Sequence, residues 1–146
     1  MTPDTLFQVS SIIAAIGWLM LIFISPFWKG YDKVVIGIIV AILAIIYSYL
    51  NFTNFHLSDL KGFGSLAGIL NLYQNPSILL AGWSHFLAFD LFVAVWIKRD
   101  SVKYGINHLL IVIPLIFTCM LGPLGFLLYI VIRSVKSRQY LHENFQ

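Results

Sequence analysis

Two ionisable side chains, His85 and Asp90, lie in a stretch that is otherwise apolar enough to cross a bilayer, from Leu79 to Ile97. A charged residue near the centre of a membrane helix costs roughly 2.5–3.5 kcal/mol on insertion scales. Such a side chain is retained where it is paired, faces a wet cavity or takes part in chemistry. A carboxylic acid kept neutral by apolar surroundings can donate a proton, and a neutral imidazole can accept one. This stretch is therefore the first place to look for acid–base chemistry.

The spacing of His85 and Asp90 limits how they can cooperate. At 100° per residue they point about 140° apart around a helix, so they cannot form a tight pair, although both can flank one cavity of a small bundle. Each residue also has a structural alternative. His85 can be bonded to a neighbouring backbone or hydroxyl group, and Asp90 can be bonded to an adjacent helix.

The composition indicates an integral membrane protein. Hydrophobic residues make up 60% of the 146 residues and charged residues 10%, whereas soluble domains are about 45–50% apolar and about 25% charged. A soluble fold of this size could not bury so much apolar surface. The net charge of +3 suits contact with anionic lipid headgroups. The basic residues form no clustered face, so we expect no nucleic-acid partner.

Apolar runs separated by polar breaks predict four membrane-spanning helices, over about residues 6–28, 34–52, 78–97 and 109–132. The connection between the second and third spans is long. Its glycine-punctuated part, at about 60–74, is too short to span and is expected to be an interfacial or re-entrant segment. We therefore predict an all-α fold in which the whole chain forms one transmembrane domain, an antiparallel four-helix bundle.

The fourth predicted span contains residues that disturb a helix. Pro114 leaves a carbonyl of the preceding turn without its donor, and residues 122–125 read GPLG. By the helical rise, Asp90 lies roughly 10 Å below the near interface, level with Pro114. His85 then lies level with Thr118 to Gly122. We expect a kinked or locally unwound helix whose concave side faces the third helix, so that its free carbonyls and the two ionisable side chains outline a pocket.

No metal or cofactor is predicted. The histidines lack the His-x-x-x-His and Glu-x-x-His spacings of metal sites, and Asp90 has no second intramembrane carboxylate beside it. There is no Gly-rich phosphate loop and no Ser or Cys nucleophile motif. The single cysteine, Cys119, cannot form an intramolecular disulfide. The first residues lack the basic region of a cleavable signal peptide.

A family resemblance comes from the run FGSLAGILNLYQNPSILLAGWSHFLAFDLFVAVWIKRDS, with GINH after it and GPLG later. This pattern resembles the abscisic-acid-deficient-4-like membrane proteins over about residues 63–133, and its most specific part is the G-W-x-H-x-x-x-x-D core. Plant members are plastid proteins associated with converting violaxanthin to neoxanthin, and this chain resembles a bacterial member. The matching positions are Gly82, Trp83, His85, Asp90, His108, Gly122 and Gly125.

The resemblance implies a protein that binds a carotenoid-like or other isoprenoid lipid and acts on it as an acid–base isomerase. Opening an epoxide to an allene delivers a proton to the epoxide oxygen and removes one from carbon, without a redox cofactor. Asp90 and His85 are the implied catalytic residues, with the substrate bridging them. The candidate ligand-binding residues are Trp83, Phe86, Phe89, His108, Pro114, Thr118 and Gly122.

The expected partners are membrane lipid and a hydrophobic small-molecule ligand, and a homo-oligomer remains open. We expect a multi-pass protein of the bacterial inner membrane. The alternative is a non-enzymatic scaffold or small transporter subunit, in which His85 and Asp90 are polar contacts between helices. An Asp90→Asn substitution separates these hypotheses, because an amide can replace a structural contact but not an acid.

Overall fold

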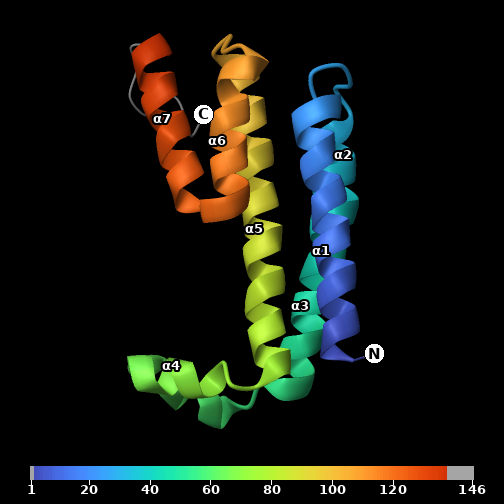
Figure 1. Ribbon diagram of the computed structural model, residues 1–146, viewed down its shortest axis with the longest axis vertical. Coiled ribbons are helices and arrows are strands. Elements are labelled where there is room, and N and C mark those ends of the chain that lie inside the picture. The colour runs from blue at the N-terminus through green and yellow to red at the C-terminus, as the bar shows by residue number, and fades with distance from the viewer. Residues whose placement is uncertain (1, 138–146) are drawn as a thin grey trace.

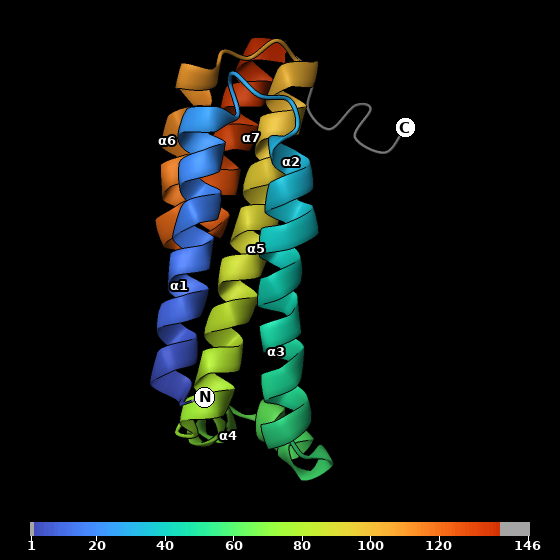
Figure 2. The ribbon, with the colours of Figure 1, turned by 90° about the vertical axis from the view of Figure 1, so that its right-hand side faces the viewer.

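The computed structural model describes residues 2–137, and no β-strand occurs among them (Figure 1). Three helical stretches are long and apolar enough to cross a membrane: Pro3–Ile24, Tyr31–Asn54 and Pro76–Lys103. Figures 1 and 2 show these three long helices running alongside one another. They confirm the helical, membrane-protein character that the composition indicates.

The first two long helices each combine α-helical and π-helical turns. The first comprises α1 (Pro3–Leu19) and the π-helical η1 (Met20–Ile24), and the Thr2 hydroxyl caps its start by accepting from the backbone N–H of Thr5. The second comprises α2 (Tyr31–Val34), the π-helical η2 (Val35–Val40) and α3 (Ala41–Asn54). π-helical turns alter the usual i→i−4 bonding, and they often mark functional positions.

The long connection forms two short helices, the 3₁₀ helix η3 (Leu57–Gly64) and α4 (Leu66–Leu72). Figure 1 shows α4 lying across the end of the long helices, roughly at right angles to them. This position favours an interfacial segment over a re-entrant one.

The central element is α5 (Pro76–Lys103), which packs against α1, α3 and α6. Its N-terminal turn is capped by the Asn75 side chain, which accepts a hydrogen bond from the backbone of Ser77. The helix continues six residues past the predicted end at Ile97. Lys98 does not stop it at the interface, because this side chain is only 5% exposed and bonds within the protein.

The prediction of a single fourth helix over 109–132 is wrong. α6 (His108–Leu121) ends at Gly122, and α7 (Pro123–Ser137) turns back and lies antiparallel to α6 (Figure 1). Gly122 has φ +49° and ψ −100°, a conformation that residues with a side chain rarely adopt. Pro123 then begins α7, where its missing N–H is tolerated. The four-helix bundle is thus not confirmed, because the described residues form three long helices and a shorter helical hairpin.

Close contact between α6 and α7 holds this hairpin together. A Cβ placed on Gly125 would overlap the backbone nitrogen and hydroxyl of Thr118 and the carbonyl of Pro114, so only glycine allows this approach. The Thr118 hydroxyl donates to the Pro114 carbonyl at 2.8 Å. α6 continues through Pro114, and the chain reverses at Gly122 instead. With 14 residues, α6 is about 21 Å long, which is short of the ~30 Å hydrocarbon core.

Candidate functional site

Asp90 lies where α5 meets the tip of the α6–α7 hairpin. A Cβ placed on Gly122 would be 3.0 Å from Asp90 Oδ1 and 3.6 Å from the ring of Phe86. Asp90 is 9% exposed, and its buried Oδ2 has no hydrogen-bond partner among the described residues. Buried polar atoms are nearly always partnered, so an unpartnered carboxyl oxygen inside an apolar helix points to a functional group.

The partner that sequence reasoning assigned to Asp90 was wrong. Counting from the true end of α5 at Lys103, Asp90 is 13 residues, or about 20 Å, along the helix. Gly122 lies 14 residues after His108, or about 21 Å along the antiparallel α6. The two residues are therefore level. Because the prediction ended this helix at Ile97, it placed Asp90 beside Pro114 and His85 beside the hairpin tip.

His85 lies on a different side of α5 from the hairpin. Its ring stacks on Phe89 at 4.4 Å between centroids and meets the Tyr47 ring of α3 at 5.5 Å. It lines a cavity of about 240 Å³ between α3, α4 and α5, and Asp90 is not among the residues that line this cavity. The structure thus does not bring the two predicted catalytic residues together.

An aromatic recess lies along α5 on the N-terminal side of Asp90. It has a volume of about 270 Å³ and is lined by Tyr73, Leu79, Gly82, Trp83 and Phe86. Trp83 and Phe86 stack at 5.6 Å, and the Trp83 indole donates to the Ser11 hydroxyl at 3.3 Å. Since Phe86 also approaches Gly122, it links the recess to Asp90. Of the predicted ligand-binding residues, Phe86 and Gly122 therefore lie beside the carboxyl group, and Trp83 packs on Phe86.

Comparison with models of protein families assigns the chain to a family. The family model described as ABA DEFICIENT 4-like matches residues 5–129, which include the Asp90 region and the hairpin tip. The chain belongs to this family. Neither the curated proteins nor the solved structures include a match to it.

The remaining predicted ligand residues of this ABA DEFICIENT 4-like protein lie away from the recess. Pro114 and Thr118 are fully buried inside the hairpin, and Phe89 lies with His85. His108 is at the other end of α6, where Nε2 contacts the carbonyl of Ile22 in η1 at 2.9 Å and Nδ1 contacts Lys98 Nζ at 3.2 Å. One tautomer satisfies both contacts, with Nε2–H donating to Ile22 and Nδ1 accepting from Lys98.

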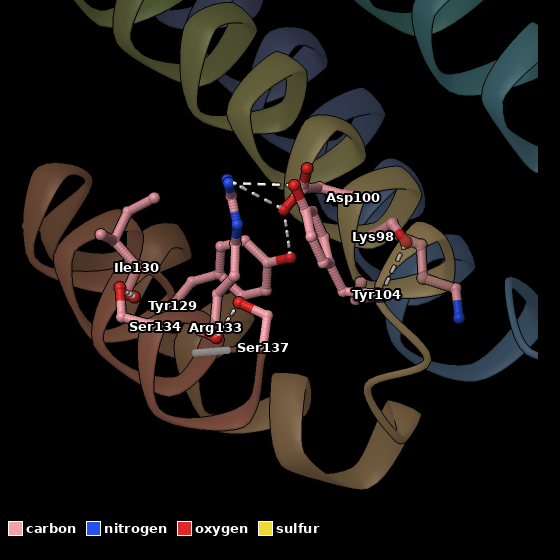
Figure 3. Close-up of polar contacts among 9 residues, drawn as sticks. Lys98, Asp100, Tyr104, Tyr129, Ile130, Arg133, Ser134 and Ser137 are labelled. Atoms are coloured by element: carbon pink, nitrogen blue, oxygen red, sulfur yellow. Dashed lines mark hydrogen bonds and ion pairs between the residues drawn. The ribbon is translucent and has the colours of Figure 1, made fainter. Parts of the chain in front are cut away.

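A buried polar cluster of this protein was missed by sequence reasoning (Figure 3). Tyr129 donates to Asp100 Oδ2 at 2.6 Å, and Arg133 Nη1 lies 3.4 Å from the same oxygen. The Arg133 guanidinium, in a side chain that is 2% exposed, lies over the Tyr104 ring at 4.5 Å and donates to its hydroxyl. These contacts hold α7 against α5.

Asp100 and Arg133 lie just outside the predicted spans 78–97 and 109–132, where charged residues are expected at a membrane surface. Their helical spacing is the signal that could have found the cluster. Asp100 and Tyr104 are four residues apart, as are Tyr129 and Arg133, so each pair occupies one helix face. Only the reversal at Gly122 brings the two faces together.

Proposed function

We propose that this protein binds a carotenoid-like or other isoprenoid lipid in the recess beneath the hairpin, and that Asp90 acts on it as an acid. The observation that carries this proposal is the buried Asp90 Oδ2, which lacks a partner among the described residues and lies beside the aromatic recess. Trp83 and Phe86 offer stacked rings to an unsaturated chain. Membership of the family supports the choice of an isoprenoid ligand.

In the proposed reaction, a neutral Asp90 donates its proton to an epoxide oxygen, and the carbon–oxygen bond opens. The Asp90 carboxylate that results then removes a proton from carbon, which forms the allene and restores the neutral acid. One carboxyl group thus both donates and takes back a proton, so the isomerisation needs no other acid or base. This assignment differs from the expected Asp90 and His85 pair, because no contact joins those two side chains in the structure.

The alternative of a non-enzymatic scaffold or transporter subunit requires Asp90 and His85 to bond neighbouring helices. Asp90 Oδ2 has no such bond within residues 2–137. His85 makes ring contacts with Tyr47 and Phe89 but no hydrogen bond to another described residue. Both observations favour the ligand-binding hypothesis.

The test is expression in a carotenoid-producing host, followed by analysis of the pigments that copurify and of the total pigment profile. The native protein should retain a pigment. Phe86→Ala should lower its occupancy, whereas Phe92→Ala, at a 50% exposed ring outside the recess, should not. Asp90→Asn should retain the pigment but leave the host profile unconverted. Empty protein in a host with an unchanged pigment profile would contradict the proposal.

A further inference from the structure

The cavity that contains His85 has the features of a second binding site. Tyr47 and Asn51 of α3, Phe63 of η3, Tyr73 after α4 and His85 of α5 contribute to its wall, which encloses about 240 Å³. Pockets that bury a whole drug-sized ligand measure roughly 300–1,000 Å³. This cavity therefore fits one end of an elongated molecule, with the remainder extending into the surrounding lipid.

A polar group lies well inside the apolar length of α5 at this cavity. His85 is nine residues from Pro76, about 14 Å along the helix. His85 forms no hydrogen bond with another described residue, although one imidazole nitrogen can donate and the other can accept. The Tyr47 ring lies 5.5 Å away, which adds a phenol near the imidazole. A hydrogen-bonding ligand group would meet both.

The wall also restricts the charge of the occupant. The residues lining the cavity include no lysine, arginine, aspartate or glutamate. A phosphate or carboxylate would therefore be desolvated there without a counter-charge, which is strongly unfavourable. A hydroxyl group has no such cost, because it can donate to or accept from the imidazole. The surrounding aromatic and aliphatic side chains suit a hydrocarbon ring or chain.

We infer that this cavity binds the hydroxyl-bearing end of a neutral lipid alcohol, with His85 hydrogen-bonded to the hydroxyl. Tyr73 and Gly82 line both this cavity and the aromatic recess, but His85 and Tyr47 take no part in the proposed reaction at Asp90, so each proposal can fail without the other. It gives His85 a binding function in place of the catalytic one expected from the sequence.

The test uses farnesol carrying a diazirine as a photoreactive probe, added to the full chain in phosphatidylcholine nanodiscs. Cross-linked peptides are mapped by mass spectrometry. Labelling should saturate and fall on residues that line this cavity but not the aromatic recess, within 47–55 and 63–72. His85→Phe should weaken apparent binding about fivefold, the size of one net hydrogen bond. His85→Gln, which keeps a donor and an acceptor, should restore most of it.

Matched controls make the result specific. Tyr49→Phe, two residues from Tyr47 but at a side chain that does not line the cavity, should leave labelling unchanged. A diazirine probe with the same hydrocarbon chain but no hydroxyl should bind the native protein about as weakly as the farnesol probe binds His85→Phe. Unsaturable labelling of exposed side chains, or equal binding by His85→Phe, would overturn the inference. Saturable labelling confined to Phe86 and the hairpin tip would also overturn it, while supporting the proposed site at Asp90.

Discussion

Replacing Gly125 with alanine should separate α7 from α6. The added Cβ would overlap backbone atoms of Thr118 and Pro114, which cannot move aside by changing a rotamer. Overpacking typically costs 1–3 kcal/mol, and we take about 3 kcal/mol here because the neighbours are backbone. The higher helix propensity of alanine offsets about 0.5–1 kcal/mol of this. The net loss is about 2 kcal/mol, which lowers the midpoint of thermal unfolding by about 4–8 °C.

The assay is thermal unfolding in one detergent, combined with distances between spin labels at Leu109 and Val135. Both side chains are exposed and lie at the open end of the hairpin, and Cys119 is first replaced by serine. The matched control is Gly37→Ala, where an added Cβ meets no atom within 4 Å. If Gly125→Ala unfolds at the same temperature as the control and keeps the native label distances, the close packing of the hairpin is refuted.

Substitutions at three further places in the fold test buried polar groups. The proposed reaction requires a neutral Asp90, so infrared spectra should show a carboxylic C=O band that Asp90→Asn removes; a native protein without the band would carry a carboxylate. Arg133→Met leaves Asp100 buried without its ion pair and should cost about 3–5 kcal/mol in unfolding free energy. The double variant Arg133→Met/Asp100→Asn should recover part of that loss. If the unfolding free energies of the two single substitutions simply add, the two side chains do not interact. His108→Phe leaves the Ile22 carbonyl without its donor and should cost about 1–3 kcal/mol, measured by thermal unfolding, with bound lipid unchanged.

The first three long helices could be predicted because runs of about 20 apolar residues have few alternatives in a chain this hydrophobic. The end of α5 could not. Lys98 and Arg99 look like an interfacial stop, but Lys98 bonds His108 and Arg99 pairs with Asp32 at the start of α2. Such contacts join residues far apart in the sequence, so local hydropathy does not report them.

The reversal at Gly122 likewise depends on contacts that the local sequence does not report. Residues 109–132 are long and apolar enough for a span, and a Gly-Pro step is compatible with a kink or a turn. The close approach at Gly125 and the buried pair of Asp100 and Arg133 select the turn. Asp90 was identified from the sequence as an unusual buried carboxyl group, but its neighbours depended on a helix register that only the fold supplies.

The backward turn of α7 also changes how the basic residues are distributed between the two ends of the molecule. The α1–α2 loop, the α5–α6 loop and the end of α7 all lie at one end of the molecule, while the start of α1 lies with η3 and α4 at the other (Figures 1 and 2). Among the described residues, the second end carries Lys61. The first end carries the other basic side chains, Lys29, Lys33, Lys98, Arg99, Lys103, Arg133 and Lys136.

Segments rich in lysine and arginine remain on the cytoplasmic side of a membrane. A continuous fourth helix would have moved Arg133 and Lys136 to the opposite end and largely cancelled this asymmetry. With the turn at Gly122, the basic residues gather at the open end of the hairpin, so we predict that this end faces the cytoplasm and that α4 lies at the opposite surface. In that orientation the aromatic recess and the His85 cavity lie on the outer side, and a lipid would reach either site from the outer leaflet.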